Sequence, residues 1–292
     1  GNFKLSGSGA LNSAGAFNLL GTTTNASLDI SGLTGSGTTL GSLAGAANSS
    51  VVLGAKNLAV GGNNSSTSYA GAISGAGGSL TKDGTGTLTL TGANSYTGGT
   101  TVNAGGLVGN TTSLQGNIAN NGAVAFNQSS DGTYGGVMSG TGSLTKSGLG
   151  GLTLSGNNSY SGNTTITAGT TTVTGSISNS STTVQSGAAL SVASGGKIGS
   201  LNNSGTASIA GSAGAITSTG ATTILSGGVG GALAVNGGTT TVNGTAGDTV
   251  VNSGGTLKGS GTVSALTIAS GGTLAVGNSP GSMTASSATW NG

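Results

Sequence analysis

The amino-acid sequence predicts an all-β protein, folded as a right-handed parallel β-helix of roughly 14 to 17 coils. Three observations carry this prediction: a long stretch that occurs twice, glycines that recur at a shorter spacing after it, and an unusual composition. The chain has 64 Gly, one Pro and 3% charged residues among its 292 residues. Collagen needs abundant proline, and charge-driven disorder needs more than the net charge of +2 found here.

Residues 1–68 carry a loose form of the pattern. Short runs rich in Val, Leu and Ile occur at Ala26–Ile30, Ser50–Leu53 and Asn57–Val60. Clusters of Gly, Asn and Ser bound them, as is typical of brief strands between turns. Residues 63–66 have the composition of a turn.

Residues 69–169 contain the two long copies, which begin at Leu80 and Leu144. In the first copy, Leu88 and Leu90 alternate with threonines, and the second copy alternates in the same way. Alternation with period two places the leucines on one face of a strand and the hydroxyls on the other. An Asn-Ser segment then interrupts each strand, and the next strands begin at residues 100 and 164.

Residues 170–292 are built on a shorter repeat. A glycine followed by small residues and then an apolar residue recurs at Gly169, Gly187, Gly205, Gly220, Gly237, Gly254 and Gly271. Glycine accepts a positive φ without steric cost, so we expect these positions to form corners. A unit this short cannot bury an apolar face alone, whereas stacked units share a continuous core.

The stacking model assigns each residue class a place. Val, Leu, Ile and Ala fill a narrow interior, and Thr, Ser and Asn form ladders outside. The repeat runs through the change of spacing near residue 169, so residues 1–292 are predicted to be one β-helical segment. The Thr positions in residues 170–276 are not expected to stay in one register.

The two long copies resemble the passenger-associated transport repeat, also described as the autotransporter-associated β-strand repeat. The first copy matches it at Leu80, Lys82, Gly84, Gly86, Thr87, Leu88, Leu90, Gly92, Asn94, Tyr96, Gly98, Thr100, Val102 and Gly105. The second matches at Leu144, Lys146, Gly148, Gly150, Leu152, Leu154, Gly156, Asn158, Tyr160, Gly162, Thr164, Ile166 and Gly169. It departs at Gly151, where the family usually has Thr.

The tail from Gly254 to Gly281 also resembles the segment near the end of many such passengers, although Val276 stands where Pro is common. The resemblance implies a bacterial surface protein with a signal peptide, a displayed β-helical passenger and an outer-membrane translocator barrel. This chain is expected to contain passenger only, on the cell surface or outside the cell, anchored or released.

The usual catalytic side chains are missing from the sequence. It has no His, Glu, Arg or Cys, so a Ser-His-Asp triad cannot form. Asp29, Asp83, Asp131 and Asp248 are far apart in sequence and are expected to be surface structure. The sequence therefore predicts no enzyme activity, no cofactor, and no catalytic, cofactor-binding or metal-binding residue.

Two further residue types in the repeat could bind ligands. The six lysines, at positions 4, 56, 82, 146, 197 and 258, are scattered singly and form no patch for nucleic acid. Lys82 and Lys146 precede turns, and lysine at a strand end discourages edge pairing. Tyr96 and Tyr160 could stack on sugars, but packing over a corner is favoured.

Three classes of function remain. The favoured one is a structural and adhesive surface segment, a stalk that promotes adhesion to host or abiotic surfaces, self-association or biofilm formation. An ice-binding face is the second class, because Thr87-Leu-Thr89-Leu-Thr91 is a Thr-x-Thr stretch. A glycan-binding or glycan-processing β-helix is the third. The ligand, the source and the oligomeric state are left open.

Overall fold

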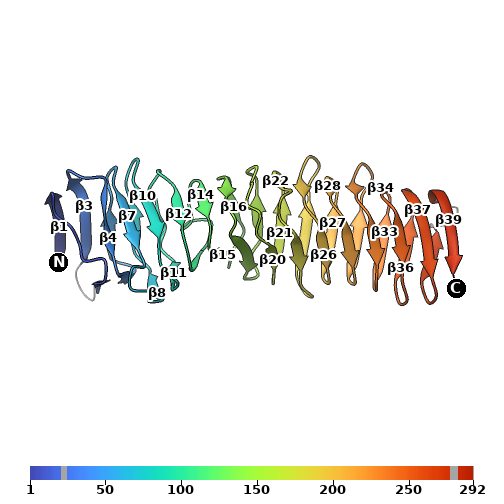
Figure 1. Ribbon diagram of the computed structural model, residues 1–292, viewed down its shortest axis with the longest axis horizontal. Coiled ribbons are helices and arrows are strands. Elements are labelled where there is room, and N and C mark those ends of the chain that lie inside the picture. Colours follow the sequence, from blue (N-terminus) through green and yellow to red (C-terminus); the bar gives the residue numbers. More distant parts are fainter. Residues whose placement is uncertain (21–24, 277–281, 292) are drawn as a thin grey trace. The chain divides into compact units, whose positions relative to one another are not determined.

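The computed structural model describes residues 1–20, 25–276 and 282–291. Within these residues the secondary structure consists of 39 strands and no helix, and the strands pair in parallel (Figure 1). The chain is a parallel β-solenoid of about 14 turns. This confirms the predicted fold class and the lower end of the predicted number of coils, while the right-handed sense stays a prediction.

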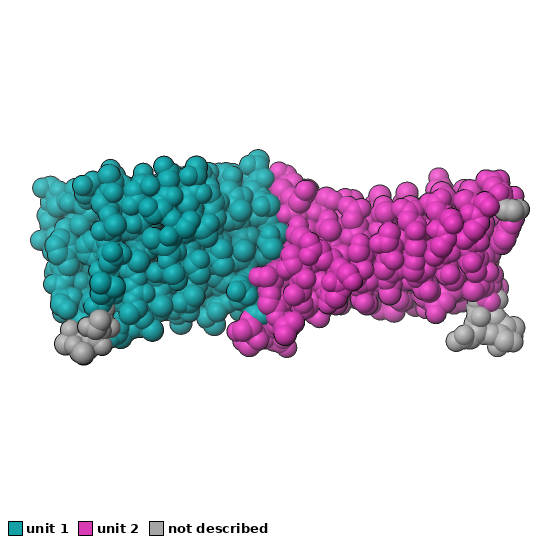
Figure 2. Space-filling view, turned by 90° about the horizontal axis from the view of Figure 1, so that it is seen from below, with its two compact units in different colours: residues 1–128, 132–145 teal, residues 129–131, 146–292 magenta. Residues whose placement is uncertain are grey.

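The chain divides into two compact units, shown in teal and magenta in Figure 2. Unit 1 comprises residues 1–128 and 132–145, and unit 2 comprises residues 129–131 and 146–292. The chain passes between the units after residue 128, after residue 131 and, within strand β18 (Ser143–Ser147), after residue 145. That residues 1–292 form a single segment stays a prediction.

Unit 1 has three parallel sheets, in each of which successive coils add one strand. The first contains β1 (Asn2–Gly7), β3 (Ser27–Leu33), β6 (Ser50–Val52) and β9 (Ala72–Ser74). The second contains β4 (Gly37–Leu40), β7 (Asn57–Val60), β10 (Ser79–Lys82), β12 (Thr100–Val102), β14 (Ile118–Asn120) and β17 (Met138–Ser139). The third contains β2 (Ala16–Leu19), β5 (Ser42–Gly45), β8 (Thr67–Tyr69), β11 (Thr87–Leu90), β13 (Gly106–Gly109) and β15 (Ala123–Asn127). Strand β16 (Gly132–Tyr134) also belongs to this unit.

Unit 2 has the same plan. One sheet contains β19 (Leu152–Leu154), β21 (Thr170–Val173), β24 (Ala189–Val192), β27 (Thr206–Ile209), β30 (Ala221–Ile224), β33 (Thr239–Val242), β36 (Thr256–Gly259) and β38 (Thr273–Val276). A second contains β20 (Thr164–Ile166), β23 (Thr182–Val184), β26 (Leu201–Asn203), β29 (Ile216–Ser218), β32 (Leu233–Val235) and β35 (Thr249–Val251). A third contains β22 (Ser176–Ile177), β25 (Lys197–Ile198), β28 (Ser212–Ala213), β31 (Val229–Gly230) and β34 (Thr245–Ala246). The long strands β37 (Thr262–Ala269) and β39 (Thr284–Asn291) continue the second and third sheets together.

The period-two pattern determines which side chains enter the solenoid. In β11, Leu88 and Leu90 are buried, while Thr87 and Thr89 are half-buried on the outer face. The equivalent strand β19 buries Leu152 and Leu154 in the same way. The predicted alternation is confirmed, as are the strands predicted in residues 26–60 and those beginning at residues 100 and 164.

The interior is more polar than predicted. Several Thr, Ser and Asn side chains are buried together with the aliphatic ones: Thr100, Thr164, Thr171, Thr182, Thr222, Thr240, Thr249, Ser113, Ser180, Ser218, Asn120 and Asn203. The assignment of these residue types to the outside was therefore wrong in part. Threonine is β-branched and suits a strand on either face, so its position in the alternation decides where it lies.

Glycines serve the corners in two different ways. Gly187 and Gly254 have positive φ values of 83° and 77°, as predicted. Gly220 does not have a positive φ; a Cβ there would meet the backbone oxygen of Gly205 in the preceding coil. At such positions glycine is required by the close approach of two backbones. Of the tail segment predicted from the sequence, residues 277–281 lie outside the described residues.

Candidate functional site

The two repeat lysines are buried, with 1% of Lys82 and none of Lys146 exposed. The Lys82 ammonium donates to the carbonyl oxygens of Asp83 at 2.7 Å, Gly84 at 2.9 Å and, one coil further, Ala104 at 3.3 Å. We call this arrangement, in which a lysine joins carbonyls of two successive coils, a lysine clasp.

The second copy has the same clasp. The Lys146 ammonium donates to the carbonyl oxygens of Gly148 at 2.8 Å and Ala168 at 3.0 Å. Burial lowers the pKa of both ammonium groups, and the nearby Asp83 and Asp131 carboxylates raise it by a smaller amount. The clasp joins coils at a corner and leaves no ammonium surface for a ligand.

The prediction that these lysines guard a strand edge was wrong. Lys82 pairs in register with Val60 on one side and Val102 on the other, and all three residues point inward. The signal was present in the sequence, because the alternation that places Leu80 inside places Lys82 inside as well.

The Asn and Tyr side chains of the repeat are also internal. Asn94 accepts a hydrogen bond from the Ile73 N–H at 2.8 Å and donates one to the Ser113 carbonyl at 2.7 Å. It therefore joins the coil before it to the coil after it. Tyr96 is 1% exposed, and its hydroxyl lies 2.7 Å from the Thr100 hydroxyl. Packing at a corner, as favoured above, agrees with these contacts.

Tyr160 repeats this arrangement with a longer network. Its hydroxyl lies 2.6 Å from that of Thr164, which lies 2.8 Å from the Ser180 hydroxyl. Ser180 in turn donates to the Gly162 carbonyl at 2.7 Å. Burial raises the pKa of Tyr160 to about 12. A buried ring of this kind offers no face for stacking on a sugar.

Each of the four aspartates binds a neighbouring polar group of the protein. The Asp83 carboxylate accepts from the Asn103 amide at 2.7 Å, and Asp131 accepts from the Gly151 N–H at 2.7 Å. Asp248 accepts from the Ala265 N–H at 3.2 Å. No group of three or more His, Cys, Asp or Glu residues that could hold a metal ion occurs in the part of the chain that the structure describes.

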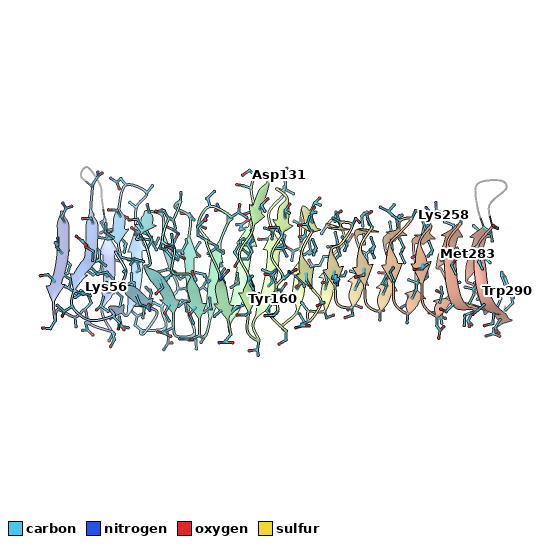
Figure 3. All side chains as sticks on the ribbon, turned by 90° about the horizontal axis from the view of Figure 1, so that it is seen from above. Lys56, Asp131, Tyr160, Lys258, Met283 and Trp290 are labelled. Atoms are coloured by element: carbon cyan, nitrogen blue, oxygen red, sulfur yellow. The ribbon has the colours of Figure 1, made fainter. Side chains whose placement is uncertain are left out.

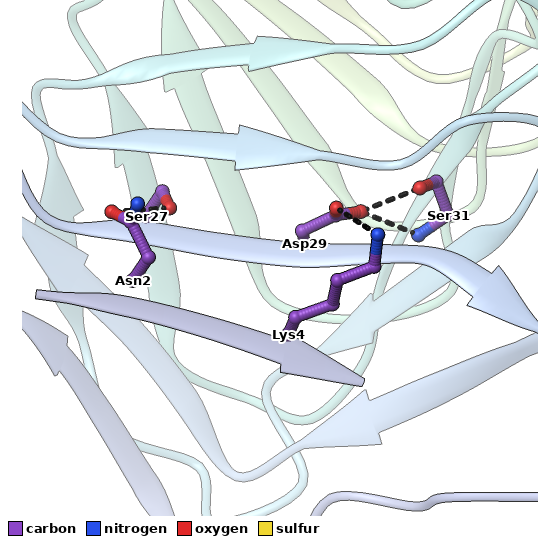
Figure 4. A network of polar contacts seen from close by, with 5 residues as sticks. All are labelled: Asn2, Lys4, Ser27, Asp29 and Ser31. Carbon is purple, nitrogen blue, oxygen red and sulfur yellow. Dashed lines mark hydrogen bonds and ion pairs between the residues drawn. The ribbon is translucent and has the colours of Figure 1, made fainter. Parts of the chain in front are cut away.

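Asp29 belongs to a small network between β1 and β3, shown in Figure 4. Its carboxylate accepts from the Ser31 hydroxyl at 2.6 Å and the Ser31 N–H at 2.9 Å, and it lies 3.6 Å from the Lys4 ammonium. The bonds from Ser31 are the main reason that the pKa of Asp29 is lowered. The Lys4 side chain is 65% exposed, so this ion pair contributes little to stability.

The outer face of the β19–β38 sheet in unit 2 carries two rows of side chains, all small except Lys258 at one end, which we call the hydroxyl face. Row one consists of Gly151, Thr170, Ala189, Thr206, Ala221, Thr239 and Thr256. Row two, two residues further along each strand, consists of Thr153, Thr172, Ser191, Ser208, Thr223, Thr241 and Lys258, which pair in that order.

These rows bear on one expectation. Thr alone does not stay in one register, as predicted, because Ala189 and Ala221 interrupt row one and Ser191 and Ser208 interrupt row two. Thr and Ser hydroxyls taken together do stay in register in row two, from Thr153 to Thr241. The spacing along the sequence varies because coils gain or lose residues at corners, while the strands themselves remain aligned. The register of the outer face could not be obtained from glycine spacings alone.

The residues that the structure describes form no helix, and so they include no helical segment that could span a membrane. A search of curated proteins gave no significant match. Residues 80–108 and 144–173 match the family model described as the passenger-associated-transport-repeat. The matched stretches contain both lysine clasps and both Asn-Tyr corners.

This repeat family suggests a location at the cell surface or outside the cell, and it implies a translocator domain in the full-length protein. The matched repeats and the parallel β-solenoid agree with each other. The repeat match and the fold together support an autotransporter passenger with passenger-associated transport repeats.

Proposed function

We propose that this chain is a structural and adhesive segment of a bacterial surface passenger, which acts as a stalk and promotes adhesion, self-association or biofilm formation. It has no catalytic role in this proposal. The four carboxylates of the chain each bind a neighbouring polar group, and general acid–base or nucleophilic chemistry needs partners that the sequence lacks.

The observation that carries the proposal is the division of polar groups between inside and outside. The repeat's specific polar residues, such as Lys82, Asn94 and Tyr96, are buried. The outer surface instead presents rows of uncharged hydroxyls, of which the hydroxyl face is one example. Such rows offer many weak and similar contacts, not one selective site.

Weak contacts become effective when they are numerous. A passenger displayed in many copies presents the same rows again and again, so that a second binding event becomes effectively intramolecular. Exposed hydroxyls both donate and accept hydrogen bonds, and they can therefore contact many polar surfaces.

The test compares cells that display this passenger on a translocator barrel with cells that display the barrel alone. Cells with the passenger are expected to settle faster or to bind surfaces better. Equal settling and equal surface binding at equal display would contradict the proposal. Cleavage of glycans by the purified chain would show a catalytic role, and this outcome would also contradict the proposal.

Ice binding is a second candidate, and the register of the hydroxyl face favours it. Thr170 and Thr172 form a Thr-x-Thr pair on β21, and Thr239 and Thr241 form another on β33. Ala189 and Ala221 interrupt the first row between them. Thermal hysteresis of the purified chain decides this candidate, and the adhesive proposal predicts none.

A further inference from the structure

The hydroxyl face has an order of side chains that suits a second copy of itself. We propose that the hydroxyl faces of two chains pack against each other, related by a two-fold axis parallel to the strands and midway between β24 and β27. This inference rests on the proposed function, because it names the partner for self-association. The axis reverses the order of the strands, so that β19 faces β33, β21 faces β30 and β24 faces β27.

Row one alternates between small and larger side chains. The order from β19 to β33 is Gly, Thr, Ala, Thr, Ala, Thr. Under the two-fold axis Gly151 faces Thr239, Thr170 faces Ala221, and Ala189 faces Thr206. Each of the three threonines from β21 to β33 thus meets a position with at most a methyl group, and shape complementarity of this kind is what close packing of two surfaces requires.

In row two, each hydroxyl of one copy faces a hydroxyl of the other copy. Thr153 faces Thr241, Thr172 faces Thr223, and Ser191 faces Ser208. A hydroxyl is both donor and acceptor, so hydroxyls that face each other can always be paired. Rows of carboxylates or ammonium groups could not pair with their own kind, because like charges repel.

The charges at the two ends of the face are complementary. Lys258 is exposed and continues row two on β36. At the other end Asp131 binds the Gly151 N–H, and a Cβ at Gly151 would lie 3.2 Å from the Asp131 Oδ1, so this carboxylate stands on the outer face. One side of β19 pairs with β21. Asp131 therefore lies on the opposite side of β19, one strand position further from β21. Figure 3 shows Asp131 and Lys258 on the same side of unit 2.

The two-fold axis brings these charges together. The strand position beyond β19 faces β36, and Lys258 of each copy therefore lies near Asp131 of the other. Symmetry makes two such pairs. A register shifted by one strand would set threonine against threonine in row one and would separate the charges.

The size of the face predicts weak pairing. Six strand intervals of ~4.8 Å and about four residues per strand give a patch of roughly 29 Å by 13 Å. Stable complexes bury about 800 Å² on each partner, and this patch is smaller. Pairing is therefore expected to be transient between free chains and to become effective among many displayed copies.

Cysteine cross-linking tests the arrangement, since the chain has no cysteine of its own. Chains with Thr172→Cys and chains with Thr223→Cys are mixed and mildly oxidised. These positions face each other across the axis, while within one chain they are three strands apart and cannot be bridged. We expect the mixture to give several-fold more disulfide-linked dimer than either variant alone.

The matched control uses another face of unit 2. Thr165 and Thr217 also lie three strands apart, on the outer row of the sheet that contains β20 and β29. A mixture of Thr165→Cys and Thr217→Cys chains should give no more dimer than its components alone. Equal yields from the two mixtures would overturn the proposal, and so would an absence of dimer from both.

Charge reversal gives an independent check. Lys258→Glu in the Thr172→Cys and Thr223→Cys chains should lower the yield of mixed dimer about 2- to 30-fold, the effect of losing two exposed ion pairs. Adding Asp131→Lys should restore the yield. An unchanged yield with Lys258→Glu, or no recovery with both substitutions, would contradict the two-fold register.

These outcomes are separable from those of the proposed function. If displaying cells clump but the mixed dimer is not favoured, the proposed function stands and this face is not the one used. If the mixed dimer is favoured but displaying cells neither clump nor bind surfaces, the pairing stands and the adhesive function fails.

Discussion

Replacing Lys146 by methionine tests whether the lysine clasp stabilises the solenoid. Methionine keeps an unbranched apolar side chain of similar length and removes the ammonium. The carbonyl oxygens of Gly148 and Ala168, which now accept at 2.8 and 3.0 Å, lose that donor. Two effects then oppose each other: the loss of these hydrogen bonds, and the removal of a buried charge.

The loss of the hydrogen bonds is expected to outweigh the gain from removing the buried charge. A buried acceptor left without a partner costs about 1–3 kcal/mol, and two acceptors are affected. Replacing a buried charge by an apolar group recovers part of this loss, because the ammonium no longer has to be desolvated. Water can also reach Gly148, which is half-buried. We expect Lys146→Met to lower the free energy of unfolding of unit 2 by about 2 kcal/mol.

The assay is denaturant unfolding of the purified chain, followed by circular dichroism. Stacked coils need not unfold in one step, so the transition midpoint of the variant is compared with that of the parent chain. Lys258→Met is the matched control, because Lys258 is exposed and such substitutions usually change stability by less than about 0.5 kcal/mol. Lys82→Met should cost more than Lys146→Met, since Lys82 donates to three carbonyls.

An unchanged or higher midpoint for Lys146→Met, at the level of the Lys258→Met control, would refute this reasoning. The buried ammonium would then be a net cost to the fold, and the carbonyls would be satisfied without it.

Three further predictions concern the polar interior. Thr222 and Thr240 are neighbours in one buried column, but only Thr222 Oγ1 is hydrogen-bonded, to Asn203 and Ser218; Thr240 Oγ1 has no partner among the residues that the structure describes. Thr240→Val should therefore be neutral or raise stability by about 1 kcal/mol, and Thr222→Val should lower it, as measured by thermal unfolding. Asn94→Ala should lower stability by about 2 kcal/mol in denaturant unfolding, because the Ile73 N–H and the Ser113 carbonyl lose their partner; no loss would show that water replaces the amide. The pKa of Tyr160 in the folded chain, about 12, lies above its ordinary value of 10.0. The contribution of the neutral Tyr160 to the free energy of unfolding is therefore complete below pH 10 and is lost as the pH rises toward 12, by about 1.4 kcal/mol per pH unit. Unfolding and tyrosinate absorbance should rise together in an alkaline titration, and ionisation of Tyr160 near pH 10 in the folded chain would contradict its burial.

The sequence was sufficient to predict a parallel solenoid of short stacked strands. The alternation around Leu88 and Leu90 reflects a strand with one buried face, and stacking is the only way for such short units to share a core. The corner residues Asn94 and Tyr96 were placed correctly because Asn94 lies in the segment that interrupts the strand and Tyr96 directly follows it.

The sequence was not sufficient for the interior contacts or for the outer face. Lys82 looked like a surface residue because charges are rarely buried, yet carbonyls from two coils satisfy its ammonium. The hydroxyl face depends on which residue of one coil lies beside which residue of the next. That register depends on the length of every corner, which glycine spacing indicates only approximately.

The most direct test of self-association through the hydroxyl face places the same charge on two faces of the displayed passenger. Thr223→Lys puts a lysine in row two of the hydroxyl face, and Thr217→Lys puts one on the outer row of a different sheet. Cells with each variant are compared for clumping and surface binding at equal display. Thr223→Lys is expected to reduce clumping strongly, while Thr217→Lys should leave clumping at the level of the parent passenger. Equal clumping of the two variants would contradict the packing of one hydroxyl face on another.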